Sequence, residues 1–493
     1  MSPRLTRLSD VTGPAALPAY DPAAHGVGIV HLGLGAFHRA HQAAMTDDAL
    51  SRDGGDWRIA SVSLRSRDVA AAMAAQNGLY TLIERDEAGM RGRVVAAIAR
   101  TIAADPAATL DALCDPGVRV VTLTVTEKGY GIDRATGGPD PENAAVRADL
   151  ETPDAPAGVL GLLVAALRRR REAGAAPFTV LCCDNLPHNG AFLRGGVTGF
   201  ARRLDPDLAD WIARTVAFPS SMVDRITPAA TGATRRDAEA LTGCTDEAAV
   251  ETEPFVQWVI EDRFPRGRPA WEAGGALFVA DVDPYERMKL RMLNGAHSMM
   301  AYAGFLSGHE FVRDVMADAV LAARVRDHLG AAAATLAPLD GMDFADYAAQ
   351  LQDRFRNPAI AHRTAQIAMD GSEKMPQRIW SPACDALDAG QDIDAFAFAT
   401  AAWMRYCRGV DETGKAHDLN DPRAQALSAA AAGEDAEAVS DAFHRLPNLI
   451  PPALRDDRAW RAAVGGSLST ILRHGMKAAA AGRHAGGGTV SDN

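Results

Sequence analysis

Strand-like apolar runs that alternate with helical segments restrict the fold of this sequence more than any other feature. From Gly26, "GVGIVHLG" is typical of a buried strand, and the following "AFHRAHQAAMTDDAL" has helical spacing. "DWRIASVSL", "VRVVTLTVTEKG" and "PFTVLCCDN" are further apolar, β-branched runs. Strands and helices that alternate in this way indicate a mainly parallel sheet covered by helices. The first part of the chain is therefore predicted to be an α/β domain.

The second part of the chain has a different pattern. After about residue 284 the β-branched runs end, and Ala-rich helical stretches such as "AVLAARVRDHLGAAAATL" replace them. A chain of 493 residues is long enough for two hydrophobic cores. We expect an α/β domain over residues 1–283 and a mainly α-helical substrate and catalytic domain over residues 284–493. Within the first, "LYTLIERD" and "GRVVAAIAR" are predicted to form a hairpin across "EAGMR".

The composition excludes several classes of function. The net charge of −12 argues against a nucleic-acid partner, which requires a basic face. The six cysteines form no C-x-x-C pair and no metal-spaced cluster with histidine, so we expect reduced thiols and no metal. There is no apolar signal sequence and no apolar run of membrane-spanning length. We expect a soluble cytoplasmic protein with a small-molecule partner and no membrane partner. The sequence leaves the oligomeric state open, and a monomer is the simplest assumption.

The stretch "VHLGLGAFHRAH" is typical of a strand-to-helix turn that binds a dinucleotide. Gly33 suits the tight bend, and Gly35 suits the close approach of backbone to pyrophosphate. The third glycine of the usual fingerprint is replaced by His38, so the match is incomplete. His38, Arg39 and His41 place donors next to the expected phosphate site. Two glycines alone are also compatible with an ordinary turn, but the position after the first strand favours a Rossmann-like domain.

The end of the second strand bears on the choice of cofactor. A carboxylate there binds the ribose hydroxyls of NAD and repels the 2′-phosphate of NADP. Asp68 in "SLRSRDVA" is the candidate, although it is also suited to the first turn of a helix. Arg65 and Arg67 flank it and would tolerate a phosphate. NAD is therefore favoured, and NADP is not excluded.

The segment "YERMKLRMLNGAHSMMAY" is predicted to be a helix with polar groups on one side. At about 100° per residue, Glu286 lies near 60° from Lys289, His297 near 80° and Asn294 near 140°. Lys289 and His297 would be roughly 12 Å apart along the axis. A solvated polar stripe is the simpler alternative. Against it, the flanks are apolar, and Asn294 and Gly295 form helices poorly.

These residues suit the oxidation of a secondary alcohol. The reaction needs a base for the hydroxyl proton and donors for the developing oxyanion. A lysine that loses its charge through burial can be the base, here Lys289. Asn294 is one candidate donor. Asn185, after the strand "FTVLCCDN", is another, because parallel sheets bind ligands at the carboxyl ends of their strands. Asn185 is equally suited to a turn before "LPHNG".

Several motifs, in order along the chain, resemble those of the long-chain polyol dehydrogenases, the family of mannitol 2-dehydrogenase and fructuronate reductase (D-mannonate oxidoreductase). The likeness extends from about Gly26 to Cys407. It rests on "GLGAFHRAHQA", "CCDNLPHNG", "FPSSMVDRITP", "FVQWVIEDRFP", "KLRMLNGAHS" and "IAMDGSEKMPQR". In this family the glycine turn has the form G-x-G-x-F-H, so Phe37 and His38 match it and join the expected cofactor site.

The resemblance implies a metal-independent oxidoreductase linked to a nicotinamide cofactor. Lys289 would be the general base in oxidation and the acid in reduction, with Glu286 relaying its proton to water. Asn185 and Asn294 would bind the oxyanion, and His297 would orient a substrate hydroxyl.

Asp224 in "MVDRITP" would line the nicotinamide side of the site. A loop carboxylate paired with Arg225 is the alternative interpretation of the same residue.

One departure bears on the substrate. Mannitol-type members carry an arginine eight residues before the basic residue of the "DGS" motif, where this chain has Gln366. The segment "HRTAQIAMDGSEK" is more similar to the fructuronate-reductase-like members. This favours D-fructuronate and D-mannonate over D-fructose and D-mannitol, and D-arabinitol stays open. A uronate carboxylate needs a cation, and the candidates are Lys374, Arg378, Arg363 and His188. Each of them is equally suited to a surface charge.

Two other classes of protein remain as alternatives. A dinucleotide-binding sensor without catalytic activity would keep the glycine turn but would not need Lys289, Asn294 and His297 together. A metal-dependent alcohol dehydrogenase is a weaker alternative, because the sequence lacks metal-spaced Cys and His.

Overall fold

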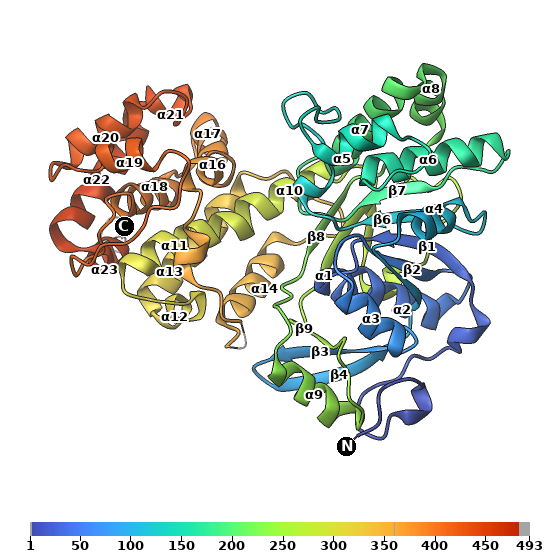
Figure 1. Ribbon diagram of the computed structural model, residues 1–493. Coiled ribbons are helices and arrows are strands. Elements are labelled where there is room, and N and C mark those ends of the chain that lie inside the picture. Colours follow the sequence, from blue (N-terminus) through green and yellow to red (C-terminus); the bar gives the residue numbers. More distant parts are fainter. Residues whose placement is uncertain (1, 359, 483–493) are drawn as a thin grey trace. The chain divides into compact units, whose positions relative to one another are not determined.

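The computed structural model describes residues 2–358 and 360–482, and the chain divides into two compact units between Asp283 and Pro284 (Figure 1). The first unit is built on a parallel sheet with the strand order β5-β2-β1-β6-β7. Its strands are β1 (Val27–Leu32), β2 (Arg58–Ser63), β5 (Ile98–Ala103), β6 (Val120–Leu123) and β7 (Thr179–Cys182).

The chain order reverses between β1 and β6, which are neighbours at the centre of this sheet. Their carboxyl ends are level, because Leu32 pairs with Leu123. In open parallel sheets a ligand binds beyond the carboxyl ends of the strands, at such a reversal. The sheet thus places the segments after β1, β6 and β7 at the edge where a dinucleotide is expected.

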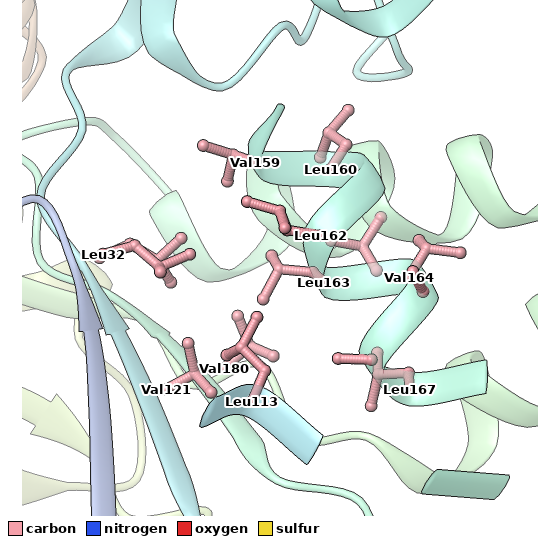
Figure 2. Packing of buried hydrophobic residues seen from close by; sticks show 14 of the residues in the cluster. Leu32, Leu113, Val121, Val159, Leu160, Leu162, Leu163, Val164, Leu167 and Val180 are labelled. Atoms are coloured by element: carbon pink, nitrogen blue, oxygen red, sulfur yellow. The ribbon is translucent and has the colours of Figure 1, made fainter. Parts of the chain in front are cut away.

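Side chains that alternate along β1 belong to two different cores. Val30 and Leu32 pack in the core formed with α4, α6 and α7, and Figure 2 shows Leu32 in this packing. Ile29 packs in the core formed with α1, α2 and α3. The helices are α1 (Ala36–Ala40), α2 (Gln42–Asp53), α3 (Asp68–Ala75), α4 (Pro106–Cys114), α6 (Val159–Glu172) and α7 (Asn189–Leu204). Helices on both faces explain why the strands have continuous apolar runs.

Two small sheets complete the first unit, and they correct one prediction. The hairpin is confirmed as β3 (Tyr80–Asp86) and β4 (Gly89–Val95), with a tighter turn than expected. The run "GRVVAAIAR" is not one strand, because β4 ends at Val95 and Ile98 begins β5 of the main sheet. The buried Ala96–Ala97 link is held by polar groups: Asp47 accepts from the Ala96 amide and Arg58 donates to the Ala96 carbonyl. The remaining strands are β8 (Ser221–Asp224), β9 (Val250–Thr252), β10 (Gln257–Glu261) and β11 (Leu277–Val279). The remaining helices of this unit are α5 (Ala144–Glu151), α8 (Pro206–Thr215) and α9 (Gly232–Thr242).

The second unit is mainly helical, which confirms the predicted fold class. Its most buried helix is α18 (Asp394–Tyr406), which packs against α11 (Gly295–Leu306) and α22 (Arg458–His474). The others are α10 (Asp283–Lys289), α12 (Val312–Ala317), α13 (Ala319–Ala334), α14 (Phe344–Arg356), α15 (Thr364–Ile367), α16 (Gly371–Met375), α17 (Ser381–Asp388), α19 (Ala424–Ala430), α20 (Ala436–Arg445), α21 (Pro452–Arg455) and α23 (Met476–Ala481). Among the described residues, no helix is both long and apolar enough to cross a membrane.

Candidate active site

Gly33 forms the bend that the sequence predicts directly after β1. Its φ of +117° lies in a region that side chains other than glycine rarely adopt. A Cβ at this position would be 2.1 Å from the Thr124 carbonyl oxygen, just beyond β6. Both the conformation and the space therefore require glycine at position 33.

Gly35 needs a different explanation, because its backbone (φ −108°, ψ 179°) is open to any residue. A Cβ built there meets only the Gly33 carbonyl oxygen, at 3.7 Å. The side-chain position of Gly35 is thus open space at the reversal of the sheet. A glycine that leaves room without needing it for its own conformation fits the close approach of a pyrophosphate to the backbone.

The polar residues after the turn are buried rather than presented at the surface. His38 and His41 are fully buried, and Arg39 is 6% exposed. Arg39 donates to the Ala248 carbonyl, and His41 Nε2 lies 3.0 Å from the Gln257 carbonyl oxygen. Phe37 is half-buried and stacks on His41 with 5.0 Å between ring centroids. The side chains of His38, Arg39 and His41 therefore lie in the core beneath the turn, where Arg39 also donates to the Gly35 carbonyl.

Asp68 is exposed and begins α3, five residues after β2 ends. This position satisfies both interpretations, the ribose ligand and the acid of a first helical turn. Its role in cofactor choice stays a prediction.

The carboxyl ends of β6 and β7 are joined by Asp184, which precedes the predicted donor Asn185. The Asp184 carboxylate accepts from the amides of Val125 (2.9 Å) and Thr126 (3.2 Å) and from the Tyr130 hydroxyl (2.6 Å). Burial raises the pKa of Asp184. Asn185 itself is exposed. The exposed amide is thus anchored through its neighbour in the chain.

Asn189, at the start of α7, holds the segment after β7 through hydrogen bonds to both Asp184 and Ser221. Its side chain is fully buried and donates to the carbonyls of Asp184 (3.1 Å) and Ser221 (2.6 Å). Its oxygen accepts from the Ser221 amide at 2.9 Å. One asparagine therefore ties β7 to β8, the strand that ends in Asp224.

Asp224 is the last residue of β8 and is 9% exposed. The adjacent Arg225 forms an ion pair with Glu84, at 2.5 Å, and donates to the Glu253 carbonyl. His188 is exposed, and its Nδ1 lies 2.9 Å from Asp283 Oδ1. A histidine that faces a carboxylate is a weaker candidate for binding an anionic substrate.

The predicted catalytic helix of the second unit is interrupted by a π-helical turn, Leu290–Asn294, between α10 and α11. This corrects the predicted angles, because one extra residue in a turn rotates all that follows back by about 100°. His297 then lies about 20° from Lys289 around the axis instead of about 80°, and Asn294 about 40° instead of about 140°. The π turn therefore brings the three residues within about 60° of one another around the axis, on one face of the helix.

Gly295 follows the π turn at a point of close contact. A Cβ there would be 2.7 Å from His328 Nε2 and 3.0 Å from the Arg378 carbonyl oxygen. Arg378 lies in a second π turn, Pro376–Trp380, and donates to the Ser298 hydroxyl (3.2 Å) and the Asn294 carbonyl (3.5 Å). The poor helix former that the sequence singled out is therefore required because two π turns pack together here.

Replacement of Gly295 by alanine is expected to lower the free energy of unfolding by about 1–3 kcal/mol, because the methyl group overpacks this contact. Gly330 on α13 is the matched control, since a Cβ there has no atom within 4 Å. Gly330→Ala should raise stability slightly through helix propensity. Thermal unfolding of both variants measures the difference. Equal melting temperatures for the two variants would contradict the assigned role of Gly295.

His297 lies in a basic environment within the second unit. Its ring centroid is 4.9 Å from that of Phe355 and 5.1 Å from that of His362. Burial holds the pKa of His297 well below its usual value, and four neighbours lower it further: His362, Arg354, Arg378 and Lys289. His297 is thus a neutral ring that can both donate and accept a hydrogen bond.

Lys289 and Glu286 lie one turn apart on α10, with Lys289 6% exposed and Glu286 half-buried. Their roles as base and proton relay stay predictions.

Two further predicted substrate cations, Lys374 and Arg363, interact with neighbouring groups of the protein. Lys374 Nζ donates to the Met369 carbonyl at 2.6 Å and lies 3.8 Å from Asp370 Oδ2. Arg363 is exposed and pairs with Glu310 at 3.4 Å. Both have local structural partners, whereas Arg378 is in the environment of His297.

Two family models cover most of the chain. The mannitol dehydrogenase Rossmann domain matches residues 27–273, and the mannitol dehydrogenase C-terminal domain matches residues 281–445. The chain belongs to the mannitol dehydrogenase family. D-mannonate oxidoreductase of Escherichia coli is 43% identical to it over 85% of this chain and 87% of that protein. Mannitol 2-dehydrogenase of Cereibacter sphaeroides is also 43% identical, over 83% and 87%. The Pseudomonas fluorescens mannitol 2-dehydrogenase structure, a ternary complex with NAD and D-mannitol, has 37% identity and a TM-score of 0.78, covering 97% of this chain and 99% of that chain.

The sequence reasoning missed several polar residues that shape the site of this mannitol dehydrogenase family member. Asp184 and Asn189 flank the predicted Asn185 in "CCDNLPHNG", so their signal was proximity to a strand end. Arg354 and His362 carried no local signal, because the tertiary packing of the second unit brings them to His297.

Proposed function

We propose that this mannitol dehydrogenase family member is a metal-independent oxidoreductase that uses NAD to interconvert D-mannonate and D-fructuronate. The NAD complex of the Pseudomonas fluorescens relative and the open glycine turn of this chain support the cofactor. Bound NAD would supply or accept the hydride at the carbinol carbon.

The basic environment of His297 carries the choice of substrate. Arg354 and Lys289 are buried, at 7% and 6% exposure, Arg378 is half-buried, and the charges of all three lower the pKa of His297. Arg378 donates to two uncharged oxygens, those of the Ser298 hydroxyl and the Asn294 carbonyl, and a carboxylate would be a stronger partner for its charge. A uronate or aldonate brings a carboxylate to such a place, whereas mannitol and fructose bring only hydroxyls. Arg378 can bind a carboxylate with its guanidinium fork.

The chain's own residues are proposed to act as follows. Lys289 takes the hydroxyl proton in oxidation and returns it to the carbonyl oxygen in reduction, with Glu286 as its route to water. Asn185 and Asn294 donate side-chain N–H groups to the oxygen at which negative charge develops. His297, held neutral, orients a substrate hydroxyl. Asp224 lines the nicotinamide side of the first unit.

A side-by-side assay of NADH oxidation tests the substrate. D-fructuronate is expected to be turned over with a kcat/KM at least tenfold above that for D-fructose, and chelation by EDTA should have no effect. Fast turnover of fructose with inert fructuronate would reject the proposal.

The second candidate is the mannitol and fructose pair. The Cereibacter sphaeroides mannitol 2-dehydrogenase supports it with the same 43% identity as the mannonate oxidoreductase. Gln366, where mannitol-type members carry arginine, speaks against it. D-arabinitol should be included in the same assay.

Replacement of Arg378 by methionine separates the two candidates. If Arg378 binds the substrate carboxylate, KM for fructuronate should rise by about 10- to 100-fold, the value of one charge-assisted hydrogen bond. KM for fructose should change little. Arg363→Met is the matched control, because this arginine is exposed and paired with Glu310. An equal rise for both sugars would assign Arg378 to the π-turn contact alone.

A further inference from the structure

His31 is a polar residue within the buried, mainly apolar strand β1. It is fully buried on β1 and pairs in register with Thr122 of β6. Its Nδ1 lies 2.8 Å from the Thr122 hydroxyl oxygen. Its Nε2 lies 2.9 Å from the Thr124 hydroxyl oxygen and 3.0 Å from the Gly33 carbonyl oxygen. A side chain inside the sheet thus contacts the glycine turn directly.

The partners of His31 determine its tautomer. A carbonyl oxygen only accepts hydrogen bonds, so Nε2 must carry the proton that is directed to Gly33. Nδ1 then accepts from the Thr122 hydroxyl. Burial lowers the pKa of His31 to about 3, so the ring is neutral, and the contact with the Gly33 carbonyl sets which nitrogen carries the proton. The ring therefore has a fixed donor aimed at the turn.

Three donors converge on the Gly33 carbonyl oxygen. Besides His31, the Thr124 hydroxyl donates at 2.9 Å and the Gly35 amide at 2.6 Å. On the other side of the same peptide, the Leu34 amide donates to the Val62 carbonyl at 2.9 Å. The peptide between Gly33 and Leu34 is thus held at both its oxygen and its nitrogen. The orientation of Gly35, next along the chain, follows from it.

The ring of His38 stacks on the ring of His31. The two rings are nearly parallel, with an interplanar angle of 7° and 3.4 Å between their centroids. His38 lies on α1, after the turn, whereas His31 precedes it. The stack therefore connects the two ends of the glycine turn inside the core.

From this geometry we infer that His31 is a positioning residue: with Thr124 and the stacked ring of His38, it holds the glycine turn in its dinucleotide-binding conformation before the cofactor arrives. The inference rests on the proposed use of NAD. It assigns His38 a role behind the turn, in place of the direct phosphate contact that the sequence suggested.

Direct measurement of NADH binding by fluorescence titration tests the inference, with kcat at saturating NADH and thermal unfolding measured in parallel. Thr124→Val and His31→Phe each remove one of the two side-chain donors to the Gly33 carbonyl, and the Gly35 amide remains. Each should raise the Kd for NADH by about 5- to 30-fold, since loosening the turn adds an ordering cost to binding. The kcat at saturation should stay within about twofold, because Lys289 and its partners are unchanged. His31→Gln restores an N–H near Nε2 and should recover part of the affinity.

Thr101→Val is the matched control. Thr101 lies on β5 of the same sheet, and its hydroxyl also donates to a carbonyl, that of Ala70 on α3, at 3.0 Å. It should leave the Kd unchanged. If Thr124→Val binds NADH as the wild type does, the inference is wrong, and this variant decides even if His31→Phe fails to fold. A lower melting temperature without loss of affinity also overturns it. Failure of the proposed function is a separate outcome: NADH would bind normally, but no keto sugar would be reduced.

Discussion

Replacement of Lys289 by alanine is expected to lower kcat by about 10²- to 10⁴-fold, the usual contribution of a positioned general acid or base. The loss should be nearly the same with each keto sugar, because the proton transfer is common to all of them. The Kd for NADH, measured by fluorescence titration, should stay within about twofold of the wild type. The proposal makes Lys289 part of the chemistry and not of cofactor binding.

Arg287→Ala is the control for Lys289→Ala. Arg287 lies on the same short helix, α10, and is exposed, so its removal tests the helix without the proposed base. Its kcat should be close to that of the wild type. If Lys289→Ala loses NADH affinity to the same extent as turnover, the lysine has another function and the sensor alternative gains support.

The two glycines of the turn are expected to fail in different ways when each is replaced by alanine. Gly33→Ala combines an unfavourable φ with a Cβ 2.1 Å from the Thr124 carbonyl oxygen. It should lower the free energy of unfolding by about 2–5 kcal/mol. Gly35→Ala meets no such contact, so it should unfold like the wild type. Its methyl group would instead occupy the space for the pyrophosphate and raise the Kd for NADH at least about tenfold.

Thermal unfolding and NADH titration of both variants separate these outcomes. A Gly35→Ala protein that is stable but binds NADH weakly would support the assignment of the turn. If Gly35→Ala binds NADH normally, the pyrophosphate does not approach there, and the two glycines only make a turn.

Most of the central sheet could be predicted from the sequence, because β1, β2, β6 and β7 are buried on both faces, whereas the edge strand β5 is only partly buried. Strands buried on both faces are mostly apolar and β-branched, and runs such as "VRVVTLTV" are typical of them. The break between β4 and β5 was not within reach. Val94 to Ile98 are uniformly apolar, and only the hydrogen bonds of Asp47 and Arg58 to Ala96 show where one sheet ends.

The polar face of the proposed catalytic helix was predicted in its residue types but not in its angles. Lys289, Asn294 and His297 are recognisable as residue types in an apolar setting. A π turn adds one residue to a helix and shifts the angular position of every residue after it, so a constant period of 3.6 residues gave the wrong angles. The only hint of the π turn in the sequence was that Asn294 and Gly295 form helices poorly. Their presence is explained by the contacts of both residues with Arg378, which is distant in the sequence.

Residues that contact the glycine turn and the strand ends from within the core were the hardest to predict from the sequence. His31 has the appearance of one more member of a buried strand, and its partners Thr122 and Thr124 are more than ninety positions away. Hydrogen bonds between such distant positions leave no periodic trace in a single sequence. Asp184 was equally hidden, because its partners follow a different strand.

The π turn ahead of Gly295 limits how this chemistry can be transplanted. Grafting the lysine, asparagine and histidine at their present spacing onto a straight helix would turn the histidine away from the lysine by about a quarter of a revolution. Deleting one residue from the graft would restore the angle, but the graft would still lack the second π turn, whose Arg378 donates to Ser298 and to the Asn294 carbonyl. A design that transfers Lys289, Asn294 and His297 to another protein must therefore also transfer the π turn, Leu290–Asn294.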